Sequence, residues 1–342
     1  MKIIHFLSIS IVLGLALSAC DQTPESSSYS PPRNSWGQPD IGGVWSNGTT
    51  TPFERPEEFG NQLVLTEEQA REIQGEAEDY REAGNVATDP NAPEPQDKNT
   101  AAGYNRFWTD PGTRVMRVGG EPRSSLITFP ESGRIPPRLP SAEKIARRRL
   151  PPGGAFTEAA SFSGPRDNPE ERGISERCIL MNSSAGPVHR PTLYNNNFLI
   201  TQGKDAVSLT VEMIHDNRVI RIGGEHRNDG VKQWLGDSIG WYEGDTLVVE
   251  TKDYHPSQNF FGASDQLTVT ERFTRVADDR LLYQFKVEDP KTWGEAWGGE
   301  YEFWASPGFY EYACHEGNIG LEGILAGGRR ADKEAAEKAK LE

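Results

Sequence analysis

The chain has 342 residues, a formal net charge of -15 at pH 7 and three cysteines. An acidic excess of this size repels nucleic acids and anionic lipid surfaces, which argues against both as partners and leaves small neutral or cationic molecules open. We expect one large domain, because no segment between Trp36 and Gly328 has the composition of a linker.

The amino terminus has the pattern of a secretory signal peptide over residues 1–19. Lys2 precedes an apolar run from Ile3 to Leu17, which is short for a membrane-spanning helix. No later apolar stretch approaches the roughly 20 residues that such a helix needs. We therefore exclude residues 1–19 from the fold and expect an exported protein without a spanning helix.

The signal peptide ends in the tetrad Leu17-Ser18-Ala19-Cys20. This tetrad resembles the lipobox of bacterial lipoproteins, whose cysteine is lipidated and becomes the new amino terminus. The alternative is an ordinary signal peptide followed by a chance cysteine. Asp21 resembles the signal that keeps lipoproteins on the inner membrane. The sequence thus predicts a protein of the cell envelope that faces the periplasm and touches the membrane only through its lipid anchor.

Residues 20–38 are rich in Ser, Pro, Gln and Asn, which predicts a lipidated flexible tether. We expect residues 39–328 to form a single β-rich domain and residues 329–342 to form a charged tail. Thr66 and Gln69 fit a capping box, followed by helix formers to Gly84. A second short helix is expected from Ser141 to Leu150. Its basic run at residues 147–149 is interpreted as a solvated face or as partners of nearby acids, with a phosphate- or carboxylate-binding role as the alternative.

From Asn197 onward, apolar residues recur at every second position, which is typical of half-buried strands. Turn residues separate these runs and predict consecutive strands joined by tight turns. The fold class is therefore mainly β, an antiparallel meander that forms a barrel or a strongly curved sheet with a few peripheral helices. The alternating runs include Val207 to Met213, Leu247 to Thr251, Leu267 with Val269, and Leu281 to Val287.

Cys178 and Cys314 remain besides Cys20. A pair of cysteines in an oxidising compartment predicts a disulfide, with free thiols or metal ligands as the alternatives. Such a bond would tie the middle of the chain to its last strand and would make Cys178 a structural cysteine rather than a nucleophile.

Several longer strings are specific enough to compare with known proteins: Gly42–Trp45, Tyr194–Asn197, Glu212–Asp216, Gln233–Ser238, Glu243–Thr251 and Tyr310–Asn318. Together they resemble a family of uncharacterised exported bacterial proteins. The resemblance covers most of the chain. It implies export and a shared fold, and it assigns no reaction and no catalytic residue.

Three histidines lie beside acidic residues: His215 with Asp216, Glu225 with His226, and His315 with Glu316. A histidine oriented by a carboxylate is a common general acid or base, and the same side chains bind zinc, iron or manganese. The cofactor is therefore unknown, with a divalent metal left open. Each histidine could instead be a turn residue that bonds only to the backbone.

The positions of these histidines make one joint site doubtful. A hairpin after Met213 would place the first two pairs at opposite ends of the barrel unless the chain doubles back, so only one of them is expected to face a pocket. His315 and Glu316 follow Cys314, whose disulfide would hold them rigidly at a rim. The catalytic candidates are thus His215, Asp216, His226, His315 and Glu316.

The ligand-binding candidates are Tyr194, Glu212, Trp234 and Tyr312. Glu212 lies on the polar face of its strand, which is either the lumen of a barrel or its solvated outside. Most aromatic residues of the later strands should lie in the core, and a few at a pocket mouth could stack on a sugar or an aromatic ring.

The sequence contains no complete serine-hydrolase motif. Gly236-Asp237-Ser238 resembles an esterase nucleophile block, but it lies far from the amino terminus and no Asp-x-x-His follows at the required spacing. There is also no Gly-x-Ser-x-Gly elbow and no phosphate-binding glycine loop.

Three functions remain after these exclusions. The leading hypothesis is an enzyme that acts on a small neutral, sugar-like or aromatic molecule by proton transfer, as a lyase, dehydratase, isomerase or hydrolase. The second is a non-catalytic lipoprotein that binds a small molecule, and the third is an envelope scaffold. The oligomeric state is unknown.

Overall fold

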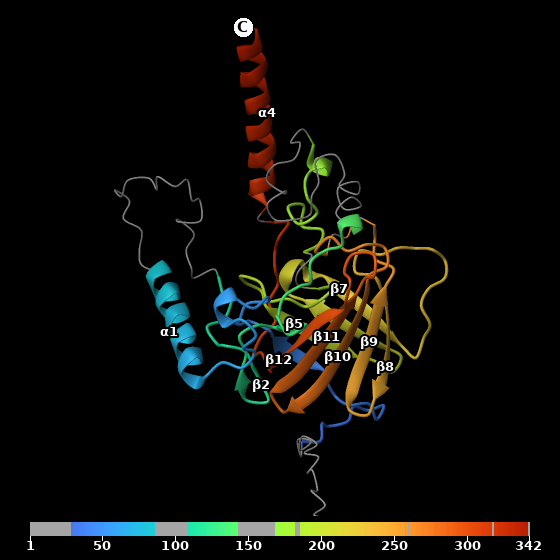
Figure 1. Ribbon diagram of the computed structural model, residues 1–342. Coiled ribbons are helices and arrows are strands. Elements are labelled where there is room, and N and C mark those ends of the chain that lie inside the picture. Colours follow the sequence, from blue (N-terminus) through green and yellow to red (C-terminus); the bar gives the residue numbers. More distant parts are fainter. Residues whose placement is uncertain are drawn as a thin grey trace, which may run out of the picture.

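A β-barrel forms the body of the protein (Figure 1). The computed structural model describes residues 29–85, 109–142, 168–181, 185–256, 258, 260–316 and 318–340. In spatial order the ring consists of β1 (Gly43–Ser46), β5 (Asn197–Gln202), β6 (Ala206–Val211), β7 (Asn217–Ile222), β8 (Asp237–Glu243), β9 (Thr246–Lys252), β10 (Thr268–Ala277), β11 (Arg280–Glu288) and β12 (Trp297–Ala305). β12 pairs back with β1 and closes the ring, and β4 (Ile127–Phe129) adds to β12.

The barrel is mixed because one pair of neighbours, β7 and β8, is parallel. All other neighbours in the ring are antiparallel, as the predicted meander requires. Parallel strands cannot be joined by a tight turn, so residues 223–236 form a crossover from the end of β7 to the opposite end, where β8 begins. We call the end with the β8–β9 and β10–β11 turns the lower end and the other the upper end, as oriented in Figure 1.

Side chains fill the inside of the barrel. Every second residue of β6 and of β11 is buried, which confirms the predicted alternation. Trp297, Tyr301 and Phe303 of β12 add large rings to the same core. Gly299 lets the chain before β4 approach β12, because a Cβ atom there would lie 1.9 Å from the carbonyl oxygen of Leu126. The interior is thus a packed core rather than a channel.

The helices lie outside the barrel. α1 (Glu67–Gly84) begins at Thr66 with the predicted capping box, in which Thr66 and Gln69 bond reciprocally. α4 (Ile319–Ala339) extends away from the upper end, and it contains most of the predicted charged tail. The predicted helix at residues 141–150, with its arginine run, lies outside the described residues beyond position 142.

Short elements complete the described chain. β2 (Arg117–Val118) and β3 (Glu121–Pro122) form a small separate sheet. The 3-10 turns are η1 (Glu57–Phe59), η4 (Pro169–Glu171) and η5 (Met213–His215). No helix in the described part of the chain is both long and apolar enough to cross a bilayer.

The first described residues lie against the lower end of the barrel. The Tyr29 hydroxyl donates to Asp278 at 3.0 Å, and Arg33 forms an ion pair with Asp245. Asp278 and Asp245 lie in the β10–β11 and β8–β9 turns. Residues 29–38, which the sequence assigned to the tether, therefore contact the domain, while Cys20 and the rest of the tether lie outside the described residues.

The predicted disulfide between Cys178 and Cys314 is present and links positions 136 residues apart. The prediction that it ties the last strand was wrong, because β12 ends at Ala305 and Cys314 lies in a turn before α4. The side-chain amide of Asn318 also donates to the carbonyl oxygen of Glu176 at 2.8 Å. The two contacts join residues 168–181 to Cys314 and Asn318, just before α4, so two segments without strands are held together at the upper end.

Candidate functional site

A pocket of about 1070 Å³ opens at the upper end of the barrel. Its size is that of cavities which hold small organic ligands. The wall comes from loops that are distant in the sequence but follow or precede the upper ends of strands. These loops contribute residues 49–54, 135–138, 190–193 and 260–262, together with Trp293.

Aromatic rings form one side of the pocket. The rings of Phe53 and Phe261 are nearly parallel, with centroids 6.1 Å apart, and Phe260 meets Phe261 edge to face at 4.8 Å. Phe261 has a φ of 50°, which a bulky residue adopts only when its surroundings hold it there. Such rings provide a rigid apolar surface on which a flat molecule could stack.

Arg190 brings a positive charge to the same surface. Its guanidinium carbon lies 4.8 Å from the centre of the Phe261 ring and 5.5 Å from that of Phe53. A cation over an aromatic face is attracted by the negative charge density of the ring. Arg138 is the second arginine of the wall, and Glu54 is the carboxylate among the described wall residues.

A network inside the barrel holds the segment that carries Arg190. We call His189, Arg218, Glu271 and Tyr283 the interior network. Arg218 pairs with Glu271, with Nη2 2.9 Å from Oε1, and the same Nη2 atom lies 2.9 Å from Nε2 of His189. Because a guanidinium has only donors, Nε2 of His189 accepts this bond. His189 is 1% exposed, so the segment reaches into the core directly beside the pocket.

Tyr283 connects the carboxylate to the backbone of the same segment. Its hydroxyl donates to Glu271 at 2.8 Å and accepts the His189 N–H at 3.3 Å. Burial alone would raise the pKa of Glu271, but the charge of Arg218 and the hydrogen bonds of its partners outweigh burial and hold that pKa below its usual range. The interior network therefore contains an ionised pair whose hydrogen bonds position His189 and, next to it, Arg190.

Glu212 lies at the upper end, where its carboxylate joins three segments. One oxygen accepts the backbone N–H of Tyr310 at 2.7 Å, and the other accepts the side-chain amides of Asn195 at 3.2 Å and Asn197 at 3.1 Å. The side chain is buried and does not line the pocket. Glu212 therefore holds the segments of Tyr310, Asn195 and Asn197 together beside the pocket wall.

Asp216 is hydrogen-bonded to Met181, a residue of the pocket wall. Its carboxylate accepts the N–H of Met181 at 3.0 Å, and Met181 belongs to the wall. Asp216 is 7% exposed, and burial raises its pKa to about 7, against the smaller opposing effect of the Met181 hydrogen bond. The neighbouring His215 is exposed, with a φ of 47°, and does not line the pocket.

The remaining predicted residues of the upper end form a rim. The rings of Tyr194 and Tyr312 stack with centroids 6.2 Å apart. In the sequence, Tyr194 follows the wall residue Leu193, and Tyr312 lies two residues before Cys314. His315 and Glu316 follow the disulfide, as predicted, and both are exposed. The structure thus brings these residues to the same end of the barrel as the pocket, but not into its wall.

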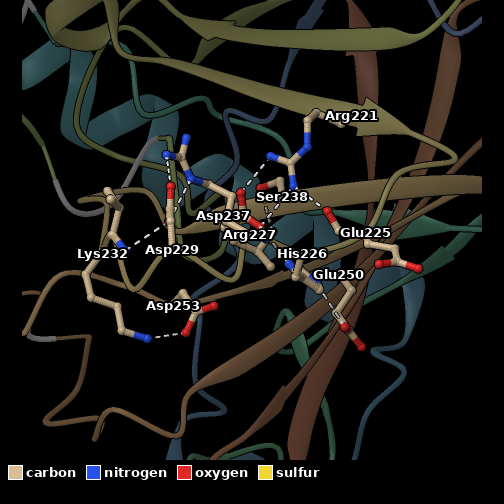
Figure 2. A network of polar contacts seen from close by, with 12 residues as sticks. Arg221, Glu225, His226, Arg227, Asp229, Lys232, Asp237, Ser238, Glu250 and Asp253 are labelled. Atoms are coloured by element: carbon tan, nitrogen blue, oxygen red, sulfur yellow. Dashed lines mark hydrogen bonds and ion pairs between the residues drawn. The ribbon is translucent and has the colours of Figure 1, made fainter.

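His226 lies elsewhere, in the polar network shown in Figure 2. Its Nδ1 atom is 2.9 Å from Asp237 and its Nε2 atom 3.0 Å from Glu250. The Asp237 carboxylate also accepts hydrogen bonds from both terminal nitrogens of Arg221, at 2.6 and 3.0 Å, and from the backbone N–H of Arg227 at 3.0 Å. The crossover returns His226 to the strands that follow, so its partners are these carboxylates rather than its neighbour Glu225.

The network of Figure 2 attaches the crossover to β7, β8 and β9. Burial opposes the charge of Asp237, but hydrogen bonds from Arg221, Arg227 and His226 outweigh it and hold the pKa of Asp237 well below its usual range. Trp234 is part of the same crossover and stacks on His255 at 4.2 Å. Neither Trp234 nor His226 lines the pocket.

No protein-family model matches the chain, and a search of curated proteins finds no similar sequence. In the part of the chain that the structure describes, no three His, Cys, Asp or Glu side chains are grouped so that they could hold a metal ion.

Sequence reasoning did not single out the residues that form the wall. Phe53, Arg138, Arg190 and Phe261 lie in loops without periodicity, and no motif joins them. The prolines beside Arg138 and Arg190 were a weak signal of extended loops that could line a cavity.

Replacing Asp216 by Asn tests whether burial raises the pKa of the Asp216 carboxyl. The folded state holds the carboxyl proton more tightly than the unfolded chain, so the stability that this proton contributes is complete below the ordinary pKa and is lost as the pH rises through about 7. The wild type should lose about 2 to 3 kcal/mol of unfolding free energy between pH 5 and 8 relative to Asp216→Asn. Urea denaturation at both pH values measures the difference.

Asp332→Asn, at an exposed position of α4, is the matched control and should follow the wild type. Equal pH dependence of the wild type and Asp216→Asn would show that the Asp216 carboxyl titrates normally.

Proposed function

We propose that the protein is a binding protein that holds a small, partly aromatic molecule in the pocket at the upper end of the barrel. The observation that carries this proposal is the pocket itself, about 1070 Å³ in volume with Phe53, Phe260, Phe261 and Trp293 in its wall. Ligand sites of proteins combine such an apolar surface with a few polar groups that orient the ligand.

Binding is favoured over catalysis because of what the wall contains. A general acid or base has to reach the reacting atoms. The described wall residues include no histidine, and their carboxylate, Glu54, accepts the N–H of Ile135 at 3.0 Å. The histidines that the sequence suggested as catalysts lie on the rim or on the outer face of the barrel.

A proton-transfer enzyme, acting as a lyase, dehydratase, isomerase or hydrolase, is the second candidate. It is favoured by Asp216, whose pKa of about 7 suits an acid or base near neutral pH and whose partner Met181 lies in the wall. Loss of turnover in Asp216→Asn with unchanged ligand affinity would favour this candidate, whereas turnover equal to that of the wild type would exclude Asp216 as the catalyst.

Phe53→Ala tests the binding proposal with 2-naphthamide, a neutral aromatic probe. Removing one ring of the aromatic surface should weaken binding about 5- to 20-fold, since aromatic contacts of this kind contribute about 1 to 2 kcal/mol. Isothermal titration calorimetry on the purified full chain measures the affinity, and a thermal melt checks the fold.

Phe129→Ala is the control, because Phe129 is a partly exposed phenylalanine of β4 outside the wall. Equal affinities of Phe53→Ala and Phe129→Ala, or no binding of the probe to the wild type, would contradict a ligand site at this pocket.

We also propose that Cys20 carries a lipid anchor and that the pocket faces away from the membrane. Tyr29 is bonded to Asp278 at the lower end of the barrel, whereas the pocket opens at the upper end. Tyr29 follows Cys20 by nine residues, which span at most about 30 Å when extended. The lower end would then stay near the membrane, and a ligand would enter from the aqueous side.

Cys20→Ser should abolish both lipid labelling and membrane association. Cells that express the wild type, Cys20→Ser or the control Ser26→Ala are fed an alkynyl fatty acid, and the labelled protein is measured in the membrane and soluble fractions. Wild type and Ser26→Ala should be labelled and sediment with membranes. Labelling that survives in Cys20→Ser would refute the anchor.

A further inference from the structure

We infer that the ligand of this pocket carries one anionic group, such as a carboxylate, sulfonate or phosphate, that Arg190 and Arg138 bind at the aromatic wall. This inference rests on the proposed binding function and names the chemical class of the ligand.

The two guanidinium groups lie against consecutive residues of the wall. Arg190 contacts the Phe261 ring, with its guanidinium carbon 4.8 Å from the ring centre. Arg138 covers Gly262, where a Cβ atom would collide with its Nη1 atom. Guanidinium groups bind planar and tetrahedral anions through paired hydrogen bonds, and they do so best where water is partly excluded. An anion at this part of the wall would be attracted by both cations.

The charge of the wall is opposite to that of the whole chain. The chain carries -15, whereas the charged wall residues among those described are Arg138, Arg190 and Glu54. Glu54 has a partner of its own, because it accepts the backbone N–H of Ile135 at 3.0 Å. The acidic surface that disfavours anionic polymers therefore surrounds a pocket with a positive excess, which favours a small anion inside.

One buried hydrogen-bond donor lies in the same wall and a second lies behind it. Trp293 is 2% exposed and lines the pocket, and its indole N–H has no acceptor among the described residues. Trp297 lies directly behind Phe53, Phe260, Phe261 and Trp293, and its indole N–H likewise has none there. A buried donor is normally paired, because leaving it without an acceptor costs free energy. An anionic group supplies acceptors in several directions.

The remaining wall defines the rest of the ligand. The parallel rings of Phe53 and Phe261 favour a flat or apolar body next to the anionic group. The ligand class is thus a small aromatic or apolar acid, in place of the neutral molecule that the net charge of the chain suggested.

The experiment compares 2-naphthoate with 2-naphthamide, which have nearly the same size and differ in charge at pH 7. Calorimetric titration of the full chain should show that naphthoate binds at least 10-fold more tightly than naphthamide. Arg190→Met keeps a long apolar side chain against the rings but removes the charge. It should weaken naphthoate binding at least 10-fold and change naphthamide binding by less than about twofold.

Arg227→Met is the control, because Arg227 pairs with Asp229 on the crossover and lies outside the wall. It should leave both affinities unchanged. Arg138→Met, at an exposed wall position, is a second variant should Arg190→Met not fold, and it should reduce the preference for naphthoate by a smaller factor.

The outcomes separate the two proposals. Naphthamide binding with no preference for naphthoate, or a preference that Arg190→Met and Arg138→Met both keep, would overturn the anionic ligand and leave the binding function intact. Binding of neither probe would overturn the binding function as well.

Discussion

The ion pair between Arg218 and Glu271 is the interaction on which the upper end of the barrel depends. Both side chains are buried among aromatic and aliphatic residues, where an unpaired charge would be costly. Two hydrogen bonds connect this pair to His189: Arg218 donates to the His189 ring, and Tyr283, which also bonds Glu271, accepts the His189 backbone N–H. Because His189 directly precedes Arg190, we expect the buried Arg218–Glu271 pair to fix the position of the Arg190 guanidinium in the pocket.

The regular part of the fold was predictable because a filled barrel buries every second side chain. This is why the runs at residues 207–211 and 281–287 identified strands. The parallel pair β7–β8 was not predictable. Its crossover begins at Gly223, like an ordinary tight turn, and its course depends on contacts of His226 with Asp237 and Glu250 that no local pattern shows. The disulfide could be predicted because only one pair of cysteines remained after Cys20.

The candidate site was less predictable than the fold, because its wall combines loops from distant parts of the chain. Histidines next to acids in the sequence drew attention, yet neighbours in the sequence do not become partners in space. His226 bonds to Asp237 and Glu250 rather than to Glu225. One signal was present: Arg218 and Glu271 lie in phase with the buried residues of their strands, and opposite charges at such positions indicate a buried pair.

A double-mutant cycle at the interior ion pair tests most directly whether it positions the pocket. Arg218→Met, Glu271→Gln and the double variant are compared by urea denaturation and by titration with 2-naphthoate. Each single change should cost about 3 to 5 kcal/mol, because it leaves a buried group without its charged partner, and the double variant should recover much of that loss. Naphthoate binding should stay weakened in the double variant, because His189 has lost its hydrogen bond with Arg218 and Arg190 is then no longer held in place. Single variants within about 1 kcal/mol of the wild type that bind the probe normally would contradict this account.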